Sequence, residues 1–102
     1  MKISVVSGGF DPIHSGHISY LKSAKKISDR LIVALNSDEW LINKKKRVFM
    51  PLEERLNILK NIECVDDVIT FEDDEKGSCI NALEDIKIKY PEPKIIFCNG
   101  GD

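Results

Sequence analysis

The chain has 102 residues, of which 42% are hydrophobic and 31% are charged, and its formal net charge is −2. This size and composition predict a single domain over residues 1–102 and argue against two domains. Because both signs of charge are mixed along the chain, a generally basic nucleic-acid binder and an acidic disordered protein are excluded.

The cysteines and the apolar runs restrict the compartment. Cys64, Cys79 and Cys98 are widely spaced and form no C-x-x-C pair, which argues against a disulfide framework and a cysteine-based zinc site. The opening apolar run is shorter than the core of a signal peptide, and no stretch approaches the length of a membrane span. We therefore expect a cytoplasmic protein with neither a membrane nor a nucleic acid as its partner.

The first half of the chain has the pattern of strand, helix and strand. Residues 3–6 form a β-branched apolar run typical of a buried strand. Ser15 is suited to cap a following helix. One apolar face of that helix is formed by Ile18, Leu21, Ala24 and Ile27. A second strand is predicted at residues 31–35.

The second half repeats this alternation. Pro51 is suited to the first turn of a helix whose apolar stripe runs to Leu59 and Ile62. A strand is predicted at 65–71, a helix from about Ser78 to Lys89, and a last strand at 94–98. Strands that alternate with helices predict an α/β fold, here a Rossmann-like parallel sheet with helices on both faces.

The loop after the first strand is the most informative segment. Residues 7–17 read S-G-G-F-D-P-I-H-S-G-H and contain both histidines of the chain. Gly8 and Gly9 allow the backbone to approach a ligand closely, and His17 falls in the first turn of a predicted helix, where free N–H groups favour an anion. A phosphate site is favoured over a zinc site, because no third metal ligand lies nearby.

Two other loops are expected beside this one. Ligands of open parallel sheets bind at the carboxyl ends of the strands, near a switch in strand order. Residues 36–38 follow the second predicted strand and residues 99–102 follow the last one. Both loops are therefore expected at the same edge of the sheet as residues 8–17.

The segment G-G-F-D-P-I-H-S-G-H closely resembles the H-x-G-H signature of the cytidylyltransferase-like nucleotidyltransferases. Resemblance to bacterial glycerol-3-phosphate cytidylyltransferases continues over nearly the whole chain, through A-L-N-S-D-E, the Lys44 to Arg47 cluster, P-L-E-E-R and V-D-D-V-I. Asn36 to Glu39, P-L-E-E-R and the terminal Gly-Gly-Asp also resemble the adenylyltransferase domain that makes ADP-heptose.

This resemblance implies transfer of a nucleotidyl group from CTP to a phosphorylated small alcohol or sugar, with release of pyrophosphate. Mg²⁺ is expected to be carried by the triphosphate. The alternatives are transfer from ATP to a sugar phosphate and a catalytically inactive nucleotide-binding module. An attacking phosphate oxygen is already ionised at neutral pH, so positioning and charge neutralisation supply the rate. Family members are often dimers, which makes a homodimer a further expectation.

The resemblance also implies roles for single residues. His14, His17 and Lys46 are expected to act in catalysis. The residues expected to bind the nucleotide are Gly8, Gly9, Phe10, Gly16 and Asp102. No protein residue is expected to ligate a metal.

Four more residues carry expected roles at the edge of the site. Lys44 and Arg55 are expected to bind the substrate, and Asp11 and Asp38 to brace their loops. Without the resemblance, the lysine run is typical of a solvated loop or a nucleic-acid patch, and an arginine after two glutamates is typical of a helix surface. Trp40 is expected in a lid or a dimer contact.

The sequence departs from the family pattern in two places. The family continues past the position of Asp102 with a strand and helix carrying an arginine and an I-S-T/S-T/S motif that grips the β and γ phosphates. The C-terminal part of the fold is therefore expected to be missing from this stretch, and its triphosphate grip to be incomplete. Glu63 stands where related cytidylyltransferases place an arginine, which weakens the case for glycerol phosphate.

Overall fold

A single parallel sheet organises the computed structural model, which describes residues 2–71, 80–90 and 94–98. Its four strands have the order β3-β2-β1-β4. The strands are β1 (Lys2–Gly8), β2 (Arg30–Leu35), β3 (Asp67–Thr70) and β4 (Lys94–Cys98). The helices are α1 (Ser15–Lys26), α2 (Asp38–Lys45), α3 (Leu52–Lys60) and α4 (Ile80–Lys89). The predicted α/β class and parallel sheet are confirmed.

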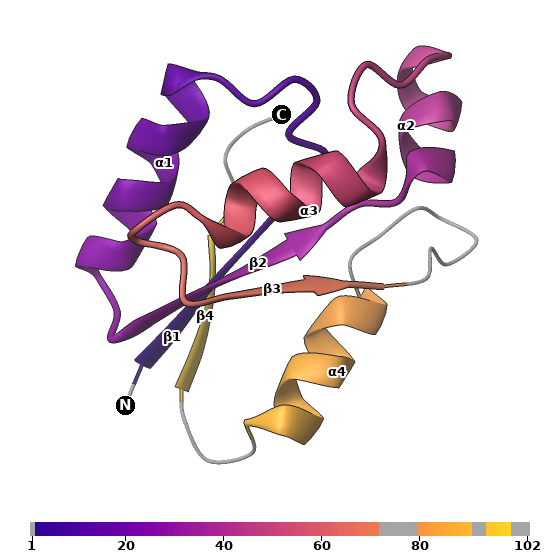
Figure 1. Ribbon diagram of the computed structural model, residues 1–102. Helices are drawn as coiled ribbons and strands as arrows, with labels where there is room; N and C mark the ends of the chain where they lie inside the picture. The colour runs from indigo at the N-terminus through magenta and orange to yellow at the C-terminus, as the bar shows by residue number, and fades with distance from the viewer. Residues whose placement is uncertain (1, 72–79, 91–93, 99–102) are drawn as a thin grey trace.

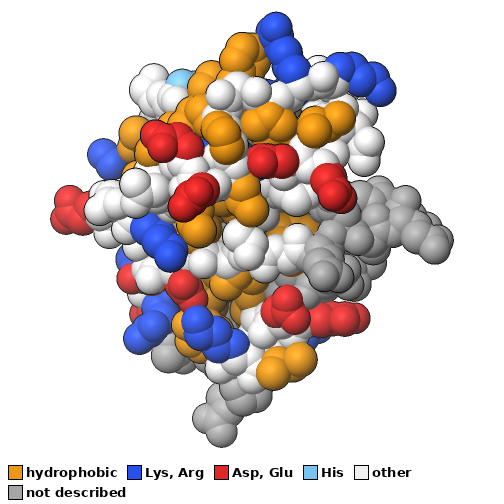
Figure 2. Space-filling view, turned by 45° about the vertical axis from the view of Figure 1, so that its right-hand side comes forward, with side chains coloured by type: hydrophobic (Ala, Val, Ile, Leu, Met, Phe, Trp, Pro, Cys, Tyr) orange, Lys and Arg blue, Asp and Glu red, His pale blue; other side chains and the backbone are white. Residues whose placement is uncertain are grey.

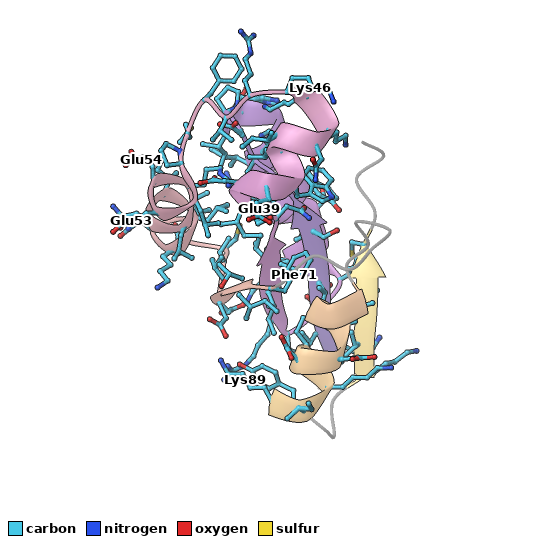
Figure 3. The ribbon with its side chains drawn as sticks, turned by 90° about the vertical axis from the view of Figure 1, so that its right-hand side faces the viewer. Glu39, Lys46, Glu53, Glu54, Phe71 and Lys89 are labelled. Carbon is cyan, nitrogen blue, oxygen red and sulfur yellow. The ribbon has the colours of Figure 1, made fainter. Side chains whose placement is uncertain are left out.

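Helices cover both faces of this sheet, as predicted (Figure 1). Successive strand residues point to opposite faces, so Val6 of β1 packs with Leu21 of α1 and Leu59 of α3. Its neighbour Val5 packs on the other face, with Ile86 of α4. Figure 3 shows α3 and α4 on opposite sides of the sheet. Two apolar cores therefore sandwich the strands.

The central strands are buried on both faces, which explains their continuous apolar sequence. Residues 31–35 of β2 are all fully buried. Because β1 pairs with β2 on one side and with β4 on the other, the strand order switches direction beside β1. The loop that follows β1 leaves the sheet at this switch point, where open α/β sheets bind ligands.

The start of α1 differs from the expected one. His14, not Ser15, is the N-cap, and Ser15 is the first helical residue. Leu21 and Ala24 are buried as predicted. The predicted burial of Ile18 and Ile27 is wrong, since they are 37% and 55% exposed. Ile27 is the C-cap residue, past the last turn that packs on the sheet.

Helix α2 was not predicted from the sequence. Its only buried residue is Leu41, so the segment has no apolar stripe that would reveal a helix. Ser37 caps its start, because the Ser37 Oγ accepts a hydrogen bond from the Trp40 amide at 3.0 Å. At its end, Lys46 adopts a left-handed conformation with φ 68°. The chain reverses there toward α3.

Several predictions fall outside the described residues: Asp102, the loop 99–102 and the predicted burial of Cys79. Within the described part, β3 is shorter than the predicted strand at 65–71, and α4 ends at Lys89 as predicted. None of the described helices is long and apolar enough to cross a membrane. On the face shown in Figure 2, basic and acidic side chains are interspersed with hydrophobic ones.

Candidate functional site

The backbone after β1 is shaped by close packing against α2. A Cβ atom on Gly9 would lie 2.6 Å from Leu41 Cδ2, so a larger residue would displace that contact. Phe10 follows with φ 50°, a left-handed conformation that is uncommon outside glycine. Its side chain is nevertheless buried, with 5% exposure. The fold thus holds the loop in one specific path toward the histidines.

The two histidines form a reciprocal cap at the start of α1. His14 Nδ1 accepts a hydrogen bond from the Gly16 amide at 3.0 Å. In return, the His14 amide donates to His17 Nδ1 at 3.1 Å. Both bonds satisfy backbone N–H groups that lack partners within the helix. A Cβ on Gly16 would lie 2.9 Å from His14 Cε1, so glycine leaves room for the ring.

This cap also stacks the two imidazole rings. Their centroids are 3.9 Å apart with an interplanar angle of 26°, and Phe10 packs edge-on against His17 at 5.0 Å. A ring nitrogen that accepts an N–H bond carries no proton, so each neutral ring bears its proton on Nε2. The sequence therefore fixes the tautomer of both rings through backbone geometry. The donor on His14 Nε2 is the kind of group that a phosphate oxygen accepts a hydrogen bond from.

The Arg55 side chain links the chain segments that surround the cleft. It is buried, with 1% exposure. It donates to the carbonyl oxygens of Gly9, Asn36 and Met50 at 2.8 to 2.9 Å. It also pairs with Asp38 Oδ1 at 2.6 Å. The interpretation as ordinary helix surface is wrong, because these four acceptors enclose the guanidinium. The substrate-binding role stays a prediction, and the contacts are those of a residue that positions loops.

Asp11 lies in the loop after β1, whereas Asp38 is the first residue of α2. Asp11 is buried, and its carboxylate accepts hydrogen bonds from the amides of Phe49 and Met50 at 2.8 and 2.5 Å. Burial raises the pKa of Asp11, but these amides and the ammonium of Lys45 together outweigh it and lower that pKa. Asp38 contacts the loops through its ion pair with Arg55. The bracing roles stay predictions that these contacts support.

The cationic residues diverge in space. The Lys44 ammonium lies 4.7 Å from the centre of the Trp40 ring and lines the cleft beside the histidines. Lys46 is exposed and is not among the residues that line this cleft. Figure 3 shows Lys46 at the end of α2, at one extremity of the molecule. The structure thus brings Lys44 to the histidines but leaves Lys46 at the rim.

Three polar side chains that line the cleft were not predicted to act there: Ser7, Tyr20 and Lys45. The Tyr20 hydroxyl donates to the Cys98 carbonyl oxygen at 2.7 Å, which joins α1 to the end of β4. Burial, and then the charge of Cys98, raise the pKa of Tyr20 to about 12. The only signal for Tyr20 was its position one turn after His17 on the same helix.

These residues enclose a cleft of about 510 Å³ at the carboxyl end of β1. A larger hollow of about 700 Å³ lies on α3, beside Glu53 and Glu54, but it contains neither histidine. Among the described residues, no group of three or more His, Cys, Asp or Glu side chains is placed to hold a metal. Imidazoles, an ammonium and backbone amides make the cleft suited to an anion.

Comparison with known proteins is consistent with this geometry. "Bifunctional protein HldE" from Enterobacter sp. (strain 638) is 39% identical over 99% of the chain, and HldE from Escherichia coli (strain K12 / DH10B) is 40% identical over the same share. The chain spans 24% of the length of these relatives.

A solved structure has the same fold. It is the lipopolysaccharide core biosynthesis protein from Thermoplasma volcanium GSS1, with a TM-score of 0.72 and 25% sequence identity. The match covers 97% of this chain and 95% of that one. The family model described as "Cytidylyltransferase-like" matches residues 5–102. The chain with the stacked histidine pair therefore belongs to the cytidylyltransferase-like family of nucleotidyltransferases.

Proposed function

We propose that the chain transfers a nucleotidyl group from ATP to a phosphorylated sugar and releases pyrophosphate. The observation that carries this proposal is the stacked pair of His14 and His17, held in one tautomer at the switch point of the sheet. In the reaction, an acceptor phosphate oxygen attacks the α-phosphorus of ATP. A new P–O–P link forms as the bond between the α-phosphorus and the bridging oxygen breaks.

The histidines act on charge that develops during this step. The Nε2–H groups donate to the oxygens of the α-phosphorus, where negative charge changes most in the transition state. The amides at the start of α1 and the positive end of its dipole favour the same anion. No general base is required, because the attacking phosphate is already ionised. The rate then comes from positioned donors rather than from proton transfer.

The acceptor is held by cations beside the histidines. Lys44 lines the cleft and points its ammonium at the face of Trp40, which leaves it within reach of an incoming phosphate. Its stem is flexible, so a modest movement takes the charge to the acceptor. Lys46 acts from the rim, when the loop that bears it moves toward the triphosphate. Both roles are consistent with neutralisation of the charges that converge in the cleft.

Mg²⁺ fits this site as a companion of the triphosphate. The Asp11 carboxylate is engaged by two amides and by Lys45, and the rest of the cleft is rich in hydrogen-bond donors. A metal would therefore take its oxygen ligands from the triphosphate and from water. When bound, it neutralises charge on the β and γ phosphates and favours departure of pyrophosphate.

The choice of ATP and a sugar rests on similarity. The segments at 36–39 and 51–55 resemble the adenylyltransferase domain that makes ADP-heptose, and the HldE relatives align over 99% of the chain. Lipopolysaccharide core is built from sugars, so the Thermoplasma volcanium structure favours a sugar phosphate as acceptor. CTP remains the rival donor, because the matching family model is described as "Cytidylyltransferase-like".

A pyrophosphate assay tests the proposal. The protein is incubated with Mg²⁺ and with ATP or CTP, each paired with a sugar 1-phosphate or with glycerol 3-phosphate. We expect pyrophosphate only with ATP and a sugar phosphate, together with a nucleotide-linked sugar as co-product. Turnover with CTP alone would reverse the choice of nucleotide. Absence of turnover with every pair would overturn the proposed activity.

A further inference from the structure

One carboxylate pins both ends of the loop that carries Lys46 and Arg47. Lys45, the last residue of α2, contacts Asp11 before the chain reverses. After the reversal, the amides of Phe49 and Met50 donate to the two oxygens of the same carboxylate. The segment 46–48 therefore projects from a base that Asp11 closes on both sides.

The contacts of Lys45 differ from those of its neighbours in the lysine run. Its ammonium lies 3.3 Å from Asp11 Oδ2 and also donates to the Asp11 carbonyl oxygen. The same ammonium lies 5.1 Å from the centre of the Phe49 ring. The Asp11 side chain is fully buried, whereas that of Lys45 is 33% exposed. This ion pair is consequently better shielded from water than a surface pair.

The position of Asp11 connects this loop to the histidines. Asp11 lies three residues before His14, in the segment whose path Phe10 and Gly9 constrain. Only Pro12 and Ile13 separate Asp11 from His14, the N-cap of α1. Lys45 contacts both the side chain and the carbonyl of Asp11, so it holds α2 to this segment.

We propose that Lys45 is a positioning residue. Through its contacts with Asp11, it fixes the position of the segment 46–48 relative to His14 and His17. The inference rests on the proposed nucleotidyl transfer and adds a residue to which neither the family resemblance nor the comparisons give a role. Lys44 and Lys46 would approach ligand phosphates, while Lys45 is engaged by the protein. The middle lysine thus determines where its neighbours act.

The first test replaces Lys45 with residues whose side chains are of similar length. Lys45→Met keeps the stem but loses the charge, and Lys45→Arg keeps the charge. With ATP and a sugar phosphate, we expect kcat/KM of Lys45→Met to fall roughly tenfold to a hundredfold, since small misplacements of reacting groups have effects of that size. Lys45→Arg should regain most of this loss. Lys22→Met, at an exposed lysine of α1 outside the cleft lining, serves as the matched control.

A double-mutant cycle distinguishes an effect of Lys45 through Asp11 from a direct contact between Lys45 and a ligand. If Lys45 acts through Asp11, the loss caused by Lys45→Met should largely disappear in an Asp11→Asn background. Additive losses would overturn the inference, as would wild-type kcat/KM in Lys45→Met. Should Lys45→Met fail to fold, Lys45→Gln takes its place in the cycle.

Hydrogen exchange gives a readout that is independent of activity. The amides of Phe49 and Met50 should exchange faster in Lys45→Met than in the wild type, while amides of α4 should not change. Unchanged exchange at both positions would overturn the proposed role of Lys45, even if no substrate pair supports turnover. A silent wild-type enzyme with faster exchange in the variant would contradict the proposed function alone.

Discussion

At the residue scale, the histidine rings have two functions on opposite edges. Nδ1 of His14 satisfies a helix amide, and Nε2 carries the proton that a phosphate can accept. In His14, one edge therefore stabilises the fold, and the other edge carries the donor that the proposed reaction uses. Substitutions can separate these functions, because a good N-cap residue need not be an imidazole.

His14→Asn should separate them. Asparagine is a preferred N-cap residue, so we expect the free energy of unfolding of the His14→Asn variant to stay within about 0.5 kcal/mol of the wild-type value. Turnover should nevertheless fall about 100-fold or more, the effect of removing one transition-state donor elsewhere. His14→Ala should lose the same turnover and, in addition, about 1 kcal/mol of stability. Denaturant unfolding and the pyrophosphate assay measure the two effects.

Ser15→Ala is the control for that experiment. The sequence pattern favoured Ser15 as the cap, but the structure places it at the first helical position, exposed to solvent. Its loss should therefore change stability by no more than about 0.5 kcal/mol. Destabilisation of Ser15→Ala by a full cap contribution, with His14→Ala unaffected, would mean that Ser15 caps the helix after all.

Asp11 should make the stability of the protein depend on acid. Its pKa is lower in the folded state than the ordinary value of 3.8, so the folded protein binds its proton less readily than the unfolded chain. Its contribution is complete above about pH 4 and is lost as the pH falls through the folded pKa. Asp11→Asn should be less stable at neutral pH and should lose less stability between about pH 5 and pH 3.

The measurement is urea unfolding at a series of pH values. Asp85→Asn removes an exposed carboxyl from α4 and should follow the wild-type curve. Equal acid slopes for Asp11→Asn and the wild type would show that the buried carboxylate is not linked to folding in this range.

At the element scale, the sequence predicted the elements that carry a continuous apolar run or a helical apolar stripe. Strand β2 is a run of five fully buried apolar residues, and α3 has a stripe that ends in the buried Leu59. Such patterns are visible without knowledge of neighbours. Helix α2 was missed because Leu41 alone is buried. Its position also depends on the ion pair between Asp38 and Arg55, a contact between distant parts of the sequence.

The family resemblance placed Arg55 in the site, whereas the helix pattern alone suggested an exposed helix surface. Its guanidinium reaches carbonyl oxygens of three separate segments, at Gly9, Asn36 and Met50. A helix pattern cannot show this, because a glutamate-rich first turn on α3 looks solvent-facing. The geometry requires a planar donor with several N–H groups.

Arg55→Lys should therefore be strongly destabilising although it keeps the charge. A lysine has one donor atom and cannot reach acceptors that lie on different sides of the guanidinium. We expect a loss of about 2–4 kcal/mol in the free energy of unfolding, from buried carbonyls left without donors. Glu54→Gln on the exposed side of the same helix should change it by less than about 0.5 kcal/mol. If Arg55→Lys lost as little stability as the control, the three carbonyl contacts of Arg55 would not stabilise the fold as we expect.

At the scale of the whole molecule, the strand order explains why the site forms where it does. Strands β2 and β3 lie on one side of β1, and β4 lies on the other. The β1 loop is therefore flanked by the ends of β2 and β4, to which Arg55 and Tyr20 connect it. Alternation of strands and helices predicted a parallel sheet and the convergence of the loops at one edge. It could not give the stacking of the imidazoles, because stacking depends on the reciprocal cap.

Ligand binding should stabilise the whole domain, because this cleft draws on α1, α2 and the end of β1. A ligand at 100 times its Kd adds about 2.7 kcal/mol to the free energy of unfolding, and each kcal/mol raises the Tm of a domain of this size by about 4–8 °C. We expect a larger Tm shift with Mg·ATP than with Mg·CTP at equal concentration. His14→Ala should abolish most of the shift, whereas Ser15→Ala should retain it. Equal shifts in all three proteins would mean that the nucleotide binds outside the histidine cleft, and a shift without pyrophosphate release would favour a binding module over an enzyme.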